Sequence, residues 1–292
     1  MAKVAEDNFS NVSFVLILIP YGLWMAYIAP HLWDRVSIAL PILGVFLFMC
    51  SVVFLYSARC IEPGILPVED VEGQTTVGGH AKKVVVLDGQ PHELERYRAK
   101  FVRETGNVVE RFDHFCPWVG NAVGVRNYRH FVMFLTATNL LSLLVLATAA
   151  LTVMSKAADY PMKGFSAYMD AHPVDALVMV GLLVYVSVRA VRCIYSKSMP
   201  VFLRRRGLIM AWGQNAQVIL LCVGGLWFYH IQLVCSNKTT NEDIKQTLER
   251  HNQYDRGCCS NCAEIMCTPA RASYFAADTD AASAAGAKTL GP

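Results

Sequence analysis

The sequence predicts an all-α integral membrane protein with four transmembrane helices and a small cytosolic domain between the second and the third. Three observations support this fold class. The 292 residues are 54% hydrophobic and only 17% charged, whereas an average soluble domain is about 25% charged. Four uncharged runs are long enough to cross a bilayer, which takes about 20 apolar residues. A single sizeable polar segment lies between the second run and the third.

The four runs define the expected spans. They lie between Asp7 and Asp34, between Arg35 and Arg59, between His130 and Lys156, and between Arg206 and Lys238. Only Asp34 and Arg35 separate the first two, so we expect a tight helical hairpin whose ends share one side of the membrane. We also expect the first run to stay in the protein as a span, because its apolar part is too long for a cleavable signal.

A fifth apolar stretch, Ala176–Val188, leaves two topologies open. As a helix its 13 uncharged residues reach about 20 Å, short of a hydrocarbon core of about 30 Å unless Arg189 and Arg192 snorkel. We therefore interpret residues 174–196 as interfacial or re-entrant. That interpretation puts the basic run Arg204–Arg206 on the non-cytosolic side, against the positive-inside tendency, so a fifth crossing stays the alternative.

The spans and polar segments divide the chain into five parts. They are residues 1–58 with the first two transmembrane helices, residues 59–130 as the cytosolic domain, residues 131–237 with the third and fourth transmembrane helices, residues 238–267 as a cytosolic C-terminal block, and residues 268–292 as a disordered tail. The tail is assigned by its small and polar composition. Within the cytosolic domain, Lys82–Leu87 predicts a short strand, and Asp88 with Gly89 predicts a turn.

Charge and cysteine content exclude several classes of protein. A net charge of +3 gives no strongly basic face of the kind that nucleic-acid binding requires. The ten cysteines do not form the pattern of a disulfide framework, and Cys50, Cys222 and Cys235 lie in or beside apolar runs as small hydrophobes. We therefore expect the polar segments to face the reducing cytosol.

The stretch Arg111–Tyr128, RFDHFCPWVGNAVGVRNY, stands out because it combines reactive side chains with a membrane edge. It places a carboxylate, an imidazole and a thiol at Asp113, His114 and Cys116, immediately before the third span. A thiol with a pKa of about 8.5 is mostly protonated at neutral pH. A neighbouring base that Asp113 orients would make Cys116 a nucleophile that can meet lipid.

Three further blocks lie far from this stretch. They are SARCIEPGILP at Ser57–Pro67, NKTTNED with Thr239, Thr240 and Glu242, and NQYDRGCCSN at Asn252–Asn261 with Tyr254. Together with Arg111–Tyr128, these blocks resemble the motifs of the DHHC protein S-acyltransferases, integral-membrane enzymes that attach palmitate to cytosolic cysteines. The blocks stand in the family's order and cover most of the chain outside the tail. Two changes are visible: Glu62 replaces the aspartate of an Asp-Pro-Gly motif, and Phe115 replaces the second histidine of the tetrad.

The resemblance breaks down at the metal ligands. The family's cysteine-rich domain binds two zinc ions through eight cysteines and histidines, and the second tetrad histidine is one of them. Counted from this tetrad, the eight positions are Asp88, Pro91, Phe101, Val102, Thr105, Val108, Phe115 and Ala122, none of which is a cysteine or a histidine. Arg98 still stands where the family has an arginine, so the register is intact. We therefore expect a degenerate cysteine-rich domain that holds no zinc.

Apolar residues at several of these positions predict a small core in place of the metals. A structural zinc contributes about 10 to 16 kcal/mol, whereas each large buried apolar side chain contributes about 1.5 to 3 kcal/mol. The core then recovers only part of the stability, and packing against the membrane face must supply the rest. We expect a domain less stable than that of zinc-bearing relatives.

The resemblance implies a role for each retained residue. Cys116 attacks the thioester of palmitoyl-CoA and passes the acyl group on, His114 is the general base, and Asp113 orients the imidazole. Thr240 contacts Asp113, and Asn261 braces the C-terminal block. The other residues of the supporting motifs are Thr239, Glu242, Asn252 and Tyr254.

The same resemblance implies partners and a topology. Palmitoyl-CoA is the co-substrate and no cofactor is needed, while the acceptors are proteins with membrane-proximal cysteines. Since Cys116 and Thr240 must lie on one side of the bilayer, an even number of crossings separates them. We expect a multi-pass protein of an endomembrane or the plasma membrane, with the catalytic loop and both termini in the cytosol.

Two other functions stay open. One is a pseudoenzyme of the same fold that serves as a membrane adaptor or chaperone, against which the joint retention of Asp113, His114 and Cys116 argues. The other is a small channel or carrier, which the lack of an acid or base at mid-depth in any span disfavours. In the C-terminal block, Cys258 and Cys259 are interpreted as acylated or free thiols.

Overall fold

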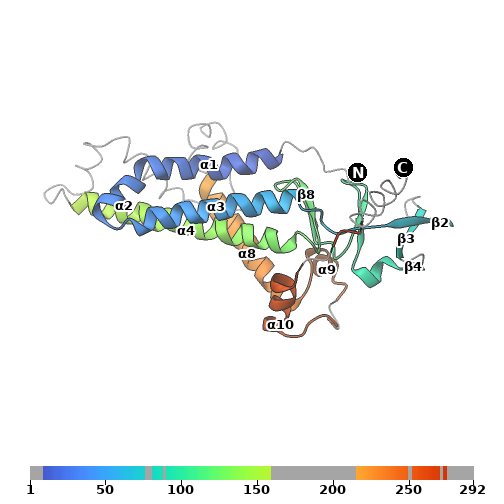
Figure 1. Ribbon diagram of the computed structural model, residues 1–292. Coiled ribbons are helices and arrows are strands. Elements are labelled where there is room, and N and C mark those ends of the chain that lie inside the picture. Colours follow the sequence, from blue (N-terminus) through green and yellow to red (C-terminus); the bar gives the residue numbers. More distant parts are fainter. Residues whose placement is uncertain are drawn as a thin grey trace, which may run out of the picture. The chain divides into compact units, whose positions relative to one another are not determined.

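The computed structural model describes residues 9–75, 81–87, 90–158, 215–248, 252–269 and 272–274, which are coloured in Figure 1. The chain divides into two compact units. The first unit comprises Met1–Ser10, Leu55–Phe131 and Ile231–Pro292, and the second comprises Asn11–Phe54 and Val132–His230. The candidate site lies entirely in the first unit.

Helices build the second unit. They are α1 at Phe9–Tyr27, α2 at Ala29–Arg35, α3 at Ala39–Cys60, α4 at Tyr128–Ala158 and α8 at Asn215–Ser236. The first residues of α1 and α4 and the last residues of α3 and α8 belong to the first unit. In the described part of the chain, three segments are long and apolar enough to cross a membrane, namely Asn11–Arg35, Ala39–Cys60 and Tyr128–Lys156. These are the first three spans expected from the sequence, and α8 coincides with the fourth expected run. The interfacial segment 174–196 and the run Arg204–Arg206 lie outside the described residues.

Polar side chains link the helices of the second unit through α4. Three bonds carry this pattern: Trp24 Nε1 to Thr148 Oγ1 at 2.8 Å, Ser51 Oγ with Thr138 Oγ1 at 2.7 Å, and Trp227 Nε1 to Thr136 Oγ1 at 2.9 Å. They join α4 to α1, α3 and α8 in turn. Polar groups in an apolar surrounding are costly unless paired, and hydrogen bonds between helices of this kind hold membrane bundles together.

The polar segment between α3 and α4, which belongs to the first unit, consists mainly of antiparallel strands, so the class all-α is too narrow for it. The strands are β1 at Ile65–Leu66, β2 at Val68–Thr75, β3 at Ala81–Leu87, β4 at Gln90–His92, β5 at Lys100–Val102, β6 at Asn107–Val109, β7 at His114–Cys116 and β8 at Asn121–Val123. They form the sheets β1-β6-β5, β2-β3-β4 and β7-β8. The strand expected at Lys82–Leu87 is confirmed as part of β3, while Asp88 and Gly89 lie outside the described residues. Most of the other strands have only two or three residues, too few for an alternation of apolar and polar residues to be recognised in the sequence.

The C-terminal block adds three short helical segments to the first unit. They are α9 at Thr240–Lys245, α10 at Cys258–Cys262 and the π-helical turn η3 at Ala263–Cys267. Thr239 caps α9 in a reciprocal capping box with Glu242, which satisfies donors that the first turn of a helix leaves unpaired. Of the expected tail 268–292, the structure describes residues 268–269 and 272–274.

Candidate functional site

A β-hairpin carries the candidate reactive residues. Strands β7 and β8 pair with His114 opposite Val123, Phe115 opposite Ala122, and Cys116 opposite Asn121. Successive side chains of a strand point to opposite faces, so His114 and Cys116 share one face and Phe115 takes the other. The strand therefore explains why a histidine and a cysteine two residues apart can act together.

A tight turn follows the cysteine. The carbonyl oxygen of Cys116 accepts hydrogen bonds from the N–H groups of Val119 at 3.2 Å and Gly120 at 2.8 Å. Gly120 has a φ of 74°, a left-handed conformation that glycine adopts without a Cβ penalty. The turn fixes the backbone on the C-terminal side of Cys116, whose side chain is 6% exposed.

Asp113 and His114 form a close pair at the start of this hairpin. Oδ2 of Asp113 lies 2.6 Å from Nδ1 of His114, and the aspartate is only 1% exposed. Burial by itself lowers the pKa of His114, but hydrogen bonds to Asp113 and Cys116 and the charges of both outweigh it and raise the pKa to about 9. The imidazole is therefore protonated at neutral pH and lies within hydrogen-bonding reach of the thiol.

Thr240 completes the surroundings of the aspartate. Its N–H donates to Oδ1 of Asp113 at 2.7 Å, and its hydroxyl donates to Oδ2 at 2.9 Å. These two donors and the imidazole hold both carboxylate oxygens, and hydrogen bonds to the ionised form favour it. The contact expected between Thr240 and Asp113 is present, across 127 residues of sequence.

A buried ion pair connects the C-terminal block to the strands. The guanidinium of Arg98 donates to both carboxylate oxygens of Glu242, with Nε 2.6 Å from Oε1, and it stacks over the Tyr254 ring at 4.3 Å. Burial raises the pKa of Glu242, but its bonds and charge contact with Arg98 prevail and the pKa lies below the usual value. Because Glu242 also caps α9 through Thr239, this pair fixes the helix that begins at Thr240.

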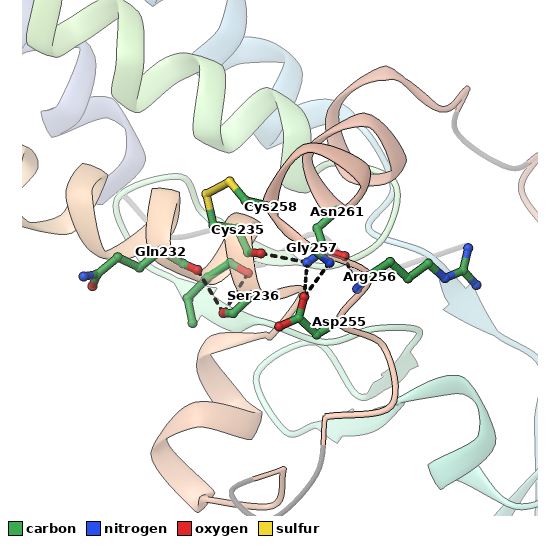
Figure 2. The surroundings of a disulfide bond; sticks show 9 residues. Gln232, Cys235, Ser236, Asp255, Arg256, Gly257, Cys258 and Asn261 are labelled. Atoms are coloured by element: carbon green, nitrogen blue, oxygen red, sulfur yellow. Dashed lines mark hydrogen bonds between the residues drawn. A yellow bond between two sulfur atoms is a disulfide. The ribbon is translucent and has the colours of Figure 1, made fainter.

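Two asparagines tie the C-terminal block to the end of α8. Nδ2 of Asn261 donates to the carbonyl of Cys235 at 2.7 Å and to Asp255 Oδ1 at 2.7 Å, as Figure 2 shows. Nδ2 of Asn252 donates to the carbonyl of Ser236 at 2.5 Å. Carbonyls in the last turn of a helix lack intrahelical partners, so the motif NQYDRGCCSN serves as a cap for α8.

The cysteines of this region depart from expectation at one place. The structure pairs Cys235 with Cys258 in a disulfide beside Asn261 (Figure 2), whereas the sequence predicts a packed hydrophobe and an acylated or free thiol. The two sulfurs meet because Asn261 holds the start of α10 against the last turn of α8. Among the described cysteines, Cys259, Cys262 and Cys267 are free and exposed.

Comparisons with known proteins agree with this geometry. Residues 92–247, just over half of the chain, match the family described as DHHC palmitoyltransferase. The chain belongs to the DHHC palmitoyltransferase family. The matched segment contains the β7-β8 hairpin, α4, α8 and α9, and thus both partners of the contact between Thr240 and Asp113.

Curated relatives extend the likeness beyond this segment. The chain is 30% identical over 290 residues to Palmitoyltransferase ZDHHC14 of Mus musculus, covering 88% of this chain and 52% of the relative. It is 27% identical to Palmitoyltransferase ZDHHC9 of Danio rerio, covering 88% and 65%, and 24% identical to Protein S-acyltransferase 8 of Arabidopsis thaliana, covering 90% and 64%. The chain thus spans about half to two thirds of the length of these relatives.

Several residues that build the site of this family member escaped the sequence reasoning. Asn237, which is fully buried, accepts from Arg98 at 3.1 Å and from Arg111 at 2.9 Å through Oδ1, and its amide donates to the carbonyl of Tyr254 at 3.1 Å. It is the first residue of the block NKTTNED, to which the sequence analysis assigned no role at this position. Its place at the head of that block, directly after an apolar run, was the available signal.

Two further asparagines hold the end of α3 to the β7-β8 hairpin. Nδ2 of Asn121 donates to the carbonyls of Arg59 at 3.0 Å and Ile61 at 3.1 Å, while Nδ2 of Asn127 donates to the carbonyl of Ala58 at 3.0 Å. Next to them, Glu62 accepts from the N–H of Gly64 at 2.6 Å and pairs with Arg126. Glutamate thus occupies the position of the motif's aspartate and makes backbone bonds there.

Phe131 also contacts the site. Its buried ring lies 5.2 Å from the imidazole of His114, centroid to centroid, with the planes 68° apart. Edge-to-face packing of this kind restrains a ring without a hydrogen bond. Phe131 belongs to the first turn of α4, so this helix and the hairpin together orient the imidazole.

Proposed function

We propose that this chain is a protein S-palmitoyltransferase that moves a fatty acyl group from palmitoyl-CoA to cysteines of cytosol-facing proteins. One observation carries the proposal: a buried thiol, a protonated imidazole and a fully hydrogen-bonded carboxylate follow one another in Cys116, His114 and Asp113. The names of the relatives, which are palmitoyltransferases and a protein S-acyltransferase, support the same reaction.

The proposed cycle has two balanced steps. A protonated imidazole next to a sulfur stabilises the thiolate, so Cys116 attacks the thioester carbonyl as the anion. The bond from the acyl carbon to CoA sulfur breaks, and the leaving thiolate takes the proton of His114. The thiol of the acceptor protein then returns a proton to His114 and attacks the acyl-enzyme, which releases Cys116. Asp113 orients the imidazole throughout and stabilises the imidazolium whenever His114 carries the proton, as a triad carboxylate does.

The topology follows from the need for cytosolic acyl-CoA. In this proposal α1 with α2, α3, α4 and α8 make four crossings, and the β7-β8 hairpin and the C-terminal block face the cytosol together with both termini. The contact of Thr240 with Asp113 supports an even number of membrane crossings in the chain between Cys116 and Thr240. The acyl chain lies among the spans, where burial of each methylene contributes about 0.8 kcal/mol, and the acceptor cysteines are membrane-proximal.

A pseudoenzyme that only binds other membrane proteins is not favoured. Such a protein has no need for a carboxylate held by two donors of Thr240 and aimed at the imidazole. Buried polar networks are costly when incomplete, and this one is complete around Asp113. The chemistry of the site therefore argues for turnover.

Autoacylation of the purified protein tests the proposal. Incubation with an alkyne analogue of palmitoyl-CoA should give a label that hydroxylamine removes, and Cys116→Ala should abolish it. His114→Ala should slow labelling by about 10²-fold or more, the usual contribution of a side chain that transfers a proton as general acid or base. Cys259→Ser serves as a matched control, since it removes an exposed thiol outside the site. Undiminished labelling of Cys116→Ala would refute Cys116 as the nucleophile.

A further inference from the structure

The positions at which the DHHC family carries its zinc ligands lie mostly on paired strands of this chain. Seven of the eight lie in the described residues, and none of the seven offers a thiol or an imidazole. Two pairs of them face each other across strands, Phe101 opposite Val108 in β5-β6 and Phe115 opposite Ala122 in β7-β8. Apolar residues are thus paired where paired ligands would have held a metal.

Three of these positions meet in one apolar cluster. Val102 and Ala122 are buried there with Val109 and Phe112, and Phe115 packs against them. We call these five residues the first apolar cluster. Side chains from β5, β6, β7 and β8 therefore converge on one point without a polar atom among them, which is an unsuitable surrounding for a divalent cation.

A fourth position belongs to a second apolar cluster. Val108 is buried with Leu66 and Val85. Five partly buried residues pack against these three, namely Val68, Leu94, Tyr97, Ala99 and Tyr274. These eight residues are the second apolar cluster. Tyr274 comes from the C-terminal side of the block, so the chain beyond α10 takes part in the core of the strand domain.

We propose that the cytosolic strand domain folds without zinc, and that the two apolar clusters, the second completed by Tyr274, take over the positioning role of the metals. The donor set supports this directly, because structural zinc sites use four cysteine or histidine ligands and the seven described positions have none. The hydroxyl of Thr105, at another of the eight positions, is buried without a partner among the described residues. That hydroxyl is a poor zinc ligand, and none of the other six described positions supplies a cysteine or a histidine beside it.

The first apolar cluster can position the reactive strand because of the strand's alternation. Phe115 lies between His114 and Cys116 and points away from them into the cluster. Anchoring this ring fixes the strand and thereby the two reactive side chains on its other face. Phe112, directly before Asp113, adds a second anchor in the same cluster. The apolar core thus acts on the site through the backbone.

Metal content and melting in the presence of a chelator test the proposal without relying on activity. The protein is purified without metal-affinity resin, and zinc is measured by mass spectrometry of the elements. We expect zinc far below one ion per chain, and a melting temperature and autoacylation rate that a strong zinc chelator leaves unchanged. In a family member with all eight ligands, the same chelator should lower both the melting temperature and the autoacylation rate. Stoichiometric zinc, or a melting temperature that falls with chelator, would overturn the proposal.

Matched substitutions test the clusters themselves. Val102 is 2% exposed and its neighbour Phe101 is 38% exposed. Val102→Ala should therefore lower the melting temperature clearly more than Phe101→Ala, even though the change from phenylalanine to alanine removes more atoms. Tyr274→Ala should lower it as well, whereas Tyr274→Phe keeps the ring and should leave it unchanged.

Thr105→Val provides a separate test that still applies if the variants of the apolar clusters fail to fold. It replaces an unpartnered buried hydroxyl by a methyl group of the same shape, so it should raise the melting temperature. A lowered melting temperature of Thr105→Val, or equal effects of Val102→Ala and Phe101→Ala, would contradict an apolar replacement of the metal sites.

Discussion

Thr240 holds both carboxylate oxygens of Asp113, with its N–H 2.7 Å from Oδ1 and its hydroxyl 2.9 Å from Oδ2. The first residue of α9 thus reaches back to the residue that precedes the reactive strand. Since Asp113 bonds in turn to His114, any change at Thr240 is transmitted to the imidazole. The C-terminal block therefore contributes to the candidate site by orienting one carboxylate.

Removing the Thr240 hydroxyl should impair catalysis more than folding. Thr240→Val keeps the shape and the backbone donor but leaves Oδ2 with one partner fewer, which costs about 1 to 3 kcal/mol. We expect autoacylation to slow about tenfold or more, and the melting temperature to fall only by the few degrees that this loss of stability implies. Thr240→Ser retains the hydroxyl and should stay near wild type. Equal rates for the Val and Ser variants would show that the hydroxyl bond is not needed.

The pKa of His114 predicts how stability depends on pH. An unfolded histidine has a pKa near 6.5, whereas His114 in the folded protein has a pKa of about 9. A folded-state pKa that is raised means that the contribution is complete below about pH 6.5 and is lost as the pH rises through 9. The difference corresponds to about 3 kcal/mol. Melting curves of wild type should therefore decline between pH 7 and pH 9.5 more steeply than those of His114→Asn.

Substitutions at the buried ion pair of Arg98 and Glu242 should have non-additive effects on the free energy of unfolding. The side chains are 9% and 11% exposed, so removing one partner leaves a buried charge unpaired, at a cost of about 3 to 5 kcal/mol. Both Arg98→Met and Glu242→Leu should therefore lower the free energy of unfolding strongly. The double variant should be more stable than the sum of the two losses implies. Strictly additive losses in this cycle would show that the two charges do not interact.

The spans were the part of the fold that the sequence predicted best. Long uncharged runs need no knowledge of distant contacts, and the runs before Asp34, Arg59 and Lys156 all became helices long enough to cross a membrane. Apart from Lys82–Leu87, the strands were missed because most of them are three residues long or less and pair through contacts such as Ile65 with Val109. Such pairs depend on tertiary context more than on local propensity.

The candidate site divides in the same way. Asp113, His114 and Cys116 follow from their spacing, because a strand or a turn brings neighbours in sequence together. Arg98, Asn121 and Asn237 did not follow, since each bonds to residues more than 60 positions away. Asparagine is common on protein surfaces, so the residue type alone does not indicate that it is buried at these places. The disulfide of Cys235 depends likewise on a contact made by the folded C-terminal block.

Asn121 provides a last test of how the end of α3 and the reactive hairpin are joined. Its amide nitrogen donates to the carbonyls of Ala58, Arg59 and Ile61 at 3.4, 3.0 and 3.1 Å, and its backbone pairs with that of Cys116. Asn121→Asp has the same shape but offers these carbonyls an acceptor in place of a donor. Burying that unpaired carboxylate should cost about 3 to 5 kcal/mol, whereas Asn121→Ala loses only the hydrogen bonds, at about 1 to 3 kcal/mol.

The two variants should therefore rank in a defined order. Asn121→Asp should melt at a lower temperature than Asn121→Ala at pH 7, and its deficit should shrink as the pH falls and the carboxyl group takes up a proton. Autoacylation of both should decline, since the end of α3 no longer fixes the strand opposite Cys116. An aspartate variant as stable as the alanine variant at pH 7 would mean that the amide does not cap α3, and that the hairpin is held to this helix by other contacts.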